Sequence, residues 1–116
     1  PYPKQIVWRQ AEVVKPYFYW LGAPRHELAP GKMVRASIHG NQVDITACDF
    51  SSLTIYLNDD LVDLDKAVTI KYGKRLLFRG RVRRKESTMR QTLTQRNDWA
   101  YMFPAMVKVN VESKKR

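Results

Sequence analysis

Apolar and polar residues alternate along several short stretches of the chain, and glycine, proline, asparagine and aspartate separate these stretches. The alternation is regular over Met33–His39 and again over Gln42–Ala47, with Gly40 and Asn41 between them. A period of two predicts strands with one buried face and one solvated face. A two-residue link that tolerates positive φ predicts that these two strands form a hairpin.

The same pattern predicts a two-sheet fold for the whole chain. Further strands are expected over Ile6–Glu12, Tyr17–Leu21, Leu53–Leu57, Val68–Tyr72, Arg75–Arg84 and Met102–Glu112. Gly73 and Lys74 supply the turn of a second hairpin. Seven or eight strands at this spacing need two packed sheets or a barrel. The predicted fold is therefore all-β, an immunoglobulin-like sandwich of seven to eight strands.

Residues Ser87–Arg96 break the strand pattern. Ser87 is a favourable N-cap, and Met89 and Leu93, with Thr92 as a further candidate, fall on one side at helical spacing. The sequence predicts one short helix near residues 87–96, inserted between the late strands.

The run around residues 78–84 has two chemically different faces. We expect the arginines Arg79, Arg81 and Arg83 to point away from the core, because they alternate with apolar residues. The residues expected to be buried on the apolar phase of their strands are Ile55, Ile70, Phe78, Val82 and Val109.

Length and composition indicate how many domains the chain forms. With 116 residues, 44% of them hydrophobic and 28% charged, one globular domain is expected. We expect residues 1–112 to form a single β-sandwich domain, followed by a basic tail over residues 113–116. No apolar run approaches the roughly 20 residues of a membrane span. Because the first residue is Pro1, we expect the chain to be a processed product or a piece cut from a longer protein.

The net charge of +10 is unevenly distributed. Residues 40–65 hold six Asp and no Lys or Arg, whereas residues 71–96 hold ten basic residues against one Glu. This polarity predicts a docking surface for an acidic neighbour. The residues assigned to the possible docking surface are Lys74, Arg75, Arg79, Arg81 and Arg83.

An alternative is a stand-alone basic module that binds nucleic acid or an anionic or carbohydrate ligand. The aromatic run from Tyr17 to Trp20 could stack on bases or sugars, although alternation puts half of it in the core. Nucleic acid is disfavoured as a partner, because no RNA-recognition or helix-turn-helix signature is present.

Candidate catalytic chemistry is sparse. Hydrolysis by a serine needs a nucleophile, a histidine base and an oxyanion hole. No G-x-S-x-G motif is present, and Ser51 and Ser52 lack flanking glycines. His26 lies in a proline-rich loop and His39 on the polar face of a strand. We therefore assign no catalytic residue and no cofactor.

Metal and disulfide sites are not predicted either. The aspartates of residues 59–65 lack the glycine and distal glutamate of a calcium loop, which favours turn chemistry over a bound cation. The single Cys48 excludes an internal disulfide and a cysteine-based zinc site. We expect it to be a packed, unreactive thiol.

A set of short motifs between residues 53 and 103 carries a family resemblance. The motifs are Leu57-Asn58-Asp59, Leu61-Val62-Asp63-Leu64-Asp65-Lys66, Val68-Thr69-Ile70, Gly73-Lys74, Phe78-Arg79-Gly80-Arg81-Val82, Thr92-Leu93 and Arg96-Asn97-Asp98. In this combination the chain resembles the C-terminal β-sandwich appended to bacterial α/β-hydrolase-type serine esterases and prolyl-oligopeptidase-like peptidases. It departs from the family pattern at Ala67, where proline is usual, at Tyr72, where asparagine is usual, and at Asn97, where glycine is usual.

The resemblance implies a non-catalytic accessory domain. In that family the catalytic triad lies in the preceding hydrolase domain, and none of its residues maps onto this chain. The implied partner is the hydrolase domain of the same polypeptide. The implied location is periplasmic or extracellular.

Overall fold

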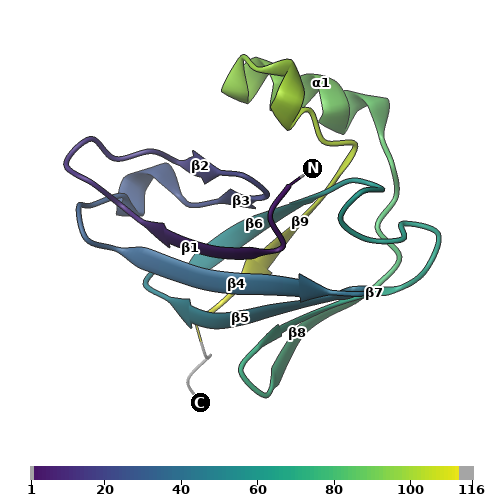
Figure 1. The fold of residues 1–116 in the computed structure, drawn as a ribbon, viewed down its shortest axis with the longest axis horizontal. Helices are drawn as coiled ribbons and strands as arrows, with labels where there is room; N and C mark the ends of the chain where they lie inside the picture. Colours follow the sequence, from purple (N-terminus) through teal and green to yellow (C-terminus); the bar gives the residue numbers. More distant parts are fainter. Residues whose placement is uncertain (1, 113–116) are drawn as a thin grey trace.

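The computed structural model describes residues 2–112, so the basic tail expected over residues 113–116 lies outside the described residues. Two sheets face each other in Figure 1. The first has the order β1 (Gln5–Arg9), β4 (Met33–His39), β5 (Gln42–Cys48), β7 (Val68–Tyr72) and β8 (Arg75–Gly80). The second has the order β2 (Tyr17–Phe18), β3 (Leu21–Gly22), β6 (Ser52–Leu57) and β9 (Ala105–Asn110). Helix α1 (Glu86–Arg96) and the 3-10 turns η1 (Arg25–Glu27) and η2 (Trp99–Tyr101) complete the described fold.

The predicted fold of two sheets with one short helix is confirmed, and the immunoglobulin-like classification stays a prediction. The described residues form nine strands, one or two more than expected. Neighbouring strands pair antiparallel except β5 and β7, which pair in parallel. Between these two parallel neighbours the chain crosses to the other sheet to form β6.

Both predicted hairpins form, and glycine makes their turns possible. Gly40 between β4 and β5 has a φ of 57°, and Gly73 between β7 and β8 has a φ of 59°. These left-handed values cost little for glycine, which has no Cβ.

The prediction of a single strand over Tyr17–Leu21 is wrong. Two two-residue strands form instead, joined by a tight turn at Tyr19 and Trp20, in which Phe18 pairs with Leu21. Tyr19 has a φ of 52° at the first central position of this turn, where glycine is usual. Because tyrosine rarely adopts that conformation, the residue types do not predict this turn.

The strand expected over Arg75–Arg84 is too long. The ladder between β7 and β8 ends where Val68, the first residue of β7, pairs with Gly80. Because β7 begins at Val68, residues after Gly80 have no residue of β7 to pair with. Val82 is nevertheless buried and its neighbours Arg81 and Arg83 are exposed, so the alternation continues without a ladder. The outer predicted strands are also shorter in the structure: β1 ends at Arg9 and β9 spans Ala105–Asn110.

The core fills the space between the sheets. Ile55 and Ile70 are fully buried, and Val82 and Val109 are nearly so, as predicted. Phe78 is only half-buried against the edge of this core, because it lies on the edge strand β8, so its predicted burial is wrong. The largest fully buried side chains are Trp20 and Phe103.

Helix α1 packs mainly through two threonines, and of the residues expected on its packed side only Thr92 is buried. Thr88 and Thr92 are buried, whereas Met89 and Leu93 are half-buried. The Thr92 hydroxyl accepts a hydrogen bond from the backbone N–H of Phe103 at 2.9 Å, which satisfies the buried oxygen. The predicted N-cap is also wrong, since the helix begins after Lys85 and no side chain caps it.

Candidate functional site

The predicted docking surface lies on and beyond β8, at one edge of the five-stranded sheet. Arg79, Arg81, Arg83 and Lys74 are exposed, in agreement with the outward direction expected for the arginines. Arg75 is half-buried and donates a hydrogen bond to the backbone carbonyl of Val111, so it ties β8 to the end of β9. Four of the five residues therefore present free cationic groups to solvent.

An apolar groove of about 340 Å³ adjoins these arginines. Phe78 and Val82 line it on one side, and Met106 and Val107 of β9 line it on the other. Its basic lining residues are Arg81, Arg83 and Lys85, and helix α1 contributes Thr88. No carboxylate lines this groove within residues 2–112. The groove lies between β8 and β9, which are the edge strands of the two sheets.

The last arginine of the basic run is paired internally. Arg84 donates two hydrogen bonds to the Asp59 carboxylate and one of 3.0 Å to Asp65. Hydrogen bonding to Arg84 holds the pKa of Asp59 below its ordinary value. In the described part of the chain, Arg79 has no carboxylate within 4.0 Å, and neither do Arg81 and Arg83. The acidic residues Asp59 and Asp65 thus neutralise only Arg84, at the end of the arginine-rich run of residues 79–84.

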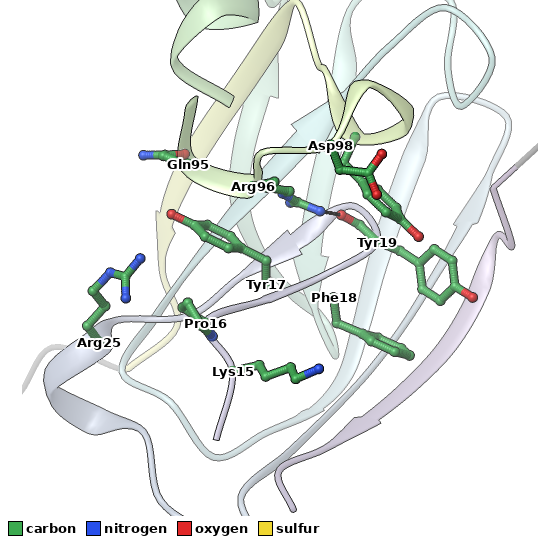
Figure 2. A pocket seen from close by; sticks show the side chains of 10 residues that line it. Lys15, Pro16, Tyr17, Phe18, Tyr19, Arg25, Gln95, Arg96 and Asp98 are labelled. Carbon is green, nitrogen blue, oxygen red and sulfur yellow. Dashed lines mark hydrogen bonds between the residues drawn. The ribbon is translucent and has the colours of Figure 1, made fainter. Parts of the chain in front are cut away.

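A second and larger cavity of about 510 Å³ lies where the C-terminal end of α1 meets the β2–β3 hairpin. Figure 2 shows Arg96 behind the ring of Tyr17, with its guanidinium directed at the backbone carbonyl of Tyr19. Arg25 and Lys15, which are both exposed, also line this cavity.

Arg96 is held by aromatic rings rather than by an acid. Its guanidinium carbon lies 4.8 Å from the ring centres of Tyr17 and Tyr56, 5.1 Å from Phe103 and 5.4 Å from Tyr101. Aromatic faces attract a cation electrostatically. Burial lowers the pKa of Arg96, although arginine remains charged at neutral pH. Its Nε and Nη2 atoms are buried and have no hydrogen-bond partner among the described residues.

Two non-glycine residues with left-handed backbone flank this contact. Tyr19, whose carbonyl accepts from Arg96, has a φ of 52°, and Asn97, which ends α1, has a φ of 53°. Such conformations persist only where surrounding contacts hold them. The hydrogen bond from Arg96 supports Tyr19, and the hydrogen bond from the Asn97 N–H to the Leu93 carbonyl supports Asn97 at the end of α1.

Ser51 and His26, which were considered as catalytic residues, both contact the carboxylate of Glu27. The Ser51 hydroxyl donates to the Glu27 carboxylate, and His26 Nε2 lies 3.5 Å from the same carboxylate. In a catalytic triad the histidine stands between serine and acid, so that it can accept the serine proton. Here Glu27 occupies that place, and its hydrogen bonds from Ser51 lower its pKa. Ser52 lies on β6, and His39 is exposed at the end of β4.

The remaining chemistry-bearing residues have local roles. Side chains of Asn58 and Asp63 accept hydrogen bonds from backbone N–H groups two or three residues further on, which is turn chemistry. Burial raises the pKa of the half-buried Cys48 thiol to about 11. Residues 2–112 bring together no group of three His, Cys, Asp or Glu side chains suited to a metal ion. None of the helices they form has the length and apolar character needed to span a membrane.

The Arg96 cluster is the feature that sequence reasoning missed. The aromatic run Tyr17–Trp20 did signal stacking surfaces, but nothing linked it to an arginine almost eighty residues later. The only local hint was the spacing of Arg96, Tyr101 and Phe103, which resembles any charged helix end followed by an apolar strand.

Comparisons with protein-family models, with curated proteins and with solved structures each return no match to this chain.

Proposed function

We propose that the chain is a non-catalytic accessory domain of a larger bacterial serine hydrolase, of esterase or peptidase type. The catalytic triad then lies in a hydrolase domain of the same polypeptide, in the periplasm or outside the cell. The family resemblance of residues 53–103 supports this proposal, as does the two-sheet fold. In this proposal the sandwich is of the immunoglobulin-like type.

The observation that carries a docking role is that Arg81 and Arg83, which have no carboxylate within 4.0 Å among residues 2–112, line an apolar groove. Exposed arginines on an edge strand also discourage unwanted strand pairing. That role alone does not require an apolar groove beside them. Met106 is 39% exposed and lines the groove, and Leu76 of β8 is 54% exposed. Apolar surface within a cationic rim is the composition of a docking site for an acidic partner surface.

The first test is the reading frame that encodes this chain. The proposal expects it to extend upstream of Pro1 and to encode a hydrolase domain with a G-x-S-x-G motif. A reading frame without a hydrolase domain would refute the accessory role.

The second test measures docking between the two domains. The upstream domain and this chain are produced separately, and their affinity is measured by calorimetry. Replacing Arg81 and Arg83 by Glu should weaken binding at least about tenfold, since each lost charge contact at an interface costs of the order of 1 kcal/mol or more. The matched control is Arg35→Glu on β4, an exposed cation away from the groove, which should leave the affinity unchanged. Equal losses in both variants would mean that the groove is not the docking site.

The second candidate function is a stand-alone module that binds nucleic acid or an anionic carbohydrate. The cavity beside Arg96 favours it, because cations and aromatic rings line the same space. Titration with duplex and single-stranded oligonucleotides at about 50 and 200 mM salt separates the two functions. Sub-micromolar affinity that persists at the higher salt would favour the binding module over the accessory domain.

A further inference from the structure

The cavity between α1 and the β2–β3 hairpin has the dimensions of a small-molecule site. Its volume of about 510 Å³ falls within the range of roughly 300–1,000 Å³ that ligand pockets occupy. Its lining includes the exposed residues Lys15 and Arg25, which Figure 2 shows with the other lining side chains.

The charge of the cavity favours an anionic group. Three cations line it, Lys15, Arg25 and Arg96, against the single carboxylate of Asp98. That carboxylate is already engaged by the backbone N–H of Ala100, at 2.9 Å, where it caps the turn η2. None of the three cations has a carboxylate within 4.0 Å in the described part of the chain.

The unused donors of Arg96 favour a carboxylate in particular. Only Nη1 of its guanidinium has an acceptor, the carbonyl of Tyr19, while Nε and Nη2 have none among residues 2–112. Buried donors without partners are rare in native proteins. Two neighbouring N–H donors on one planar group match the two oxygens of a carboxylate.

The ring of Tyr17 controls access to these donors. It stands between two guanidinium groups, with Arg96 at 4.8 Å and Arg25 at 5.9 Å from its centre. Tyr17 is half-buried and belongs to the two-residue edge strand β2, which is paired on one side only. Segments with so few hydrogen bonds open at low free-energy cost, so the ring can turn aside.

The other lining groups suit a six-membered ring. Phe18, Tyr19 and Tyr101 supply aromatic surface, on which sugar rings and aromatic rings both stack. The side chains of Gln95 and Asp98 offer hydrogen-bonding groups for ring hydroxyls.

We propose that this cavity binds a carboxylate carried by a six-membered ring, either the uronate of an acidic sugar or an aromatic acid. The carboxylate pairs with Arg96 and Arg25, and the ring lies against the tyrosines. This site is separate from the groove between β8 and β9, and it does not depend on the accessory role.

The test is a nuclear magnetic resonance titration of the 116-residue chain that follows the Nε–Hε signal of Arg96. The probes are digalacturonate and 4-hydroxycinnamate, and each has a neutral counterpart, galactobiose and 4-hydroxycinnamyl alcohol. We expect one acid to shift the Arg96 and Ala100 signals saturably while its neutral counterpart does not. The acid that does so identifies the source of the carboxylate. No shift by either acid up to about 10 mM, or equal shifts by acid and neutral probe, overturns the proposal.

Variants locate the binding. Arg25→Ala, at an exposed position, should weaken the acid at least about tenfold, because it removes a charge-assisted contact. Arg90→Ala removes an exposed arginine of α1, the helix that carries Arg96, at a position outside the cavity. It should leave the affinity unchanged. Arg96→Lys keeps the charge but loses the paired donors, and it too should weaken binding if thermal unfolding shows that it folds. Unchanged affinity in Arg25→Ala refutes the proposed site, whether or not Arg96→Lys folds.

Discussion

The guanidinium of Arg84 holds both oxygens of the Asp59 carboxylate, with nitrogen–oxygen distances of 2.6 and 3.0 Å. This fork-like contact joins the end of the arginine-rich run to the loop after β6. It is the most specific charge pair within residues 2–112, because two parallel hydrogen bonds fix its geometry.

Replacing Arg84 by Gln should return the pKa of Asp59 towards that of a free aspartate. The folded-state pKa of Asp59 is depressed, so its contribution to stability is present above the unfolded pKa of about 3.9 and is lost as the pH falls through the folded value. The variant should therefore lose less stability than the parent chain between about pH 5 and pH 2. Carboxyl chemical shifts give the pKa, and urea unfolding across this range gives the stability. Parallel pH profiles in the two proteins would contradict the pairing.

Truncations at two predicted core positions should differ in cost. Ile55→Ala removes a fully buried side chain and should lower the free energy of unfolding by about 2–5 kcal/mol. Phe78→Ala removes a larger but half-buried side chain and should cost roughly half as much as a truncation of a fully buried phenylalanine, about 1.5–2.5 kcal/mol. Denaturant unfolding measures both. A larger loss for Phe78 than for Ile55 would place Phe78 inside the core after all.

The Cys48 thiol should react slowly with disulfide reagents at pH 8. Burial raises its pKa to about 11, so little of it is the reactive thiolate. The reaction should accelerate when the chain is unfolded in urea, which serves as the reference. Because the pKa of Cys48 is higher in the folded than in the unfolded chain, its thiol contributes fully to stability below the unfolded pKa of about 8.5. This contribution to the free energy of unfolding falls as the pH rises towards 11. A Cys48→Ala variant should lack this alkaline loss.

Asn97 should tolerate glycine and resist alanine. Its φ of 53° and ψ of 39° are left-handed, which costs an alanine about 1–2 kcal/mol and a glycine nothing. Asn97→Ala should lower the free energy of unfolding by about 1 kcal/mol, whereas Asn97→Gly should be neutral or stabilising. The control Gln95→Ala, at an exposed helical position, should change it by less than about 0.5 kcal/mol. Equal effects of alanine and glycine at position 97 would argue against the left-handed cap.

The sequence predicts the fold wherever a single local rule decides the structure. The hairpins β4–β5 and β7–β8 combine strict alternation with a glycine in the turn, and their bounds differ from those expected by one residue over β4–β5 and by four at the end of β8. The β2–β3 hairpin escapes prediction because Tyr19 takes a conformation that its residue type disfavours. Besides the pairing of Phe18 with Leu21, a hydrogen bond from the distant Arg96 to the Tyr19 carbonyl stabilises that turn.

The buried face of helix α1 is also not predicted by a local pattern. Hydrophobic periodicity points to Met89 and Leu93, but the buried face carries Thr88 and Thr92. Threonine can be buried there because Phe103, eleven residues further on, supplies a partner for its hydroxyl. A pattern confined to the helix contains no information on that partner. The Arg96 cavity is hidden for the same reason, since its walls come from segments far apart in the sequence.

The parallel pairing of β5 with β7 also governs how the chain can fold. The stretch that joins them contains β6, whose partners β3 and β9 come from early and late segments. Neither sheet can therefore be completed from one contiguous half of the sequence. Most of the loop-closure entropy must be lost before these distant pairings form, and folding is expected on the millisecond-to-second scale typical of β-proteins with high contact order. During synthesis β6 cannot gain its second neighbour until residues 105–110 have left the ribosome, so the four-stranded sheet stays incomplete until almost the whole described chain has been made, although all strands of the five-stranded sheet precede residue 81.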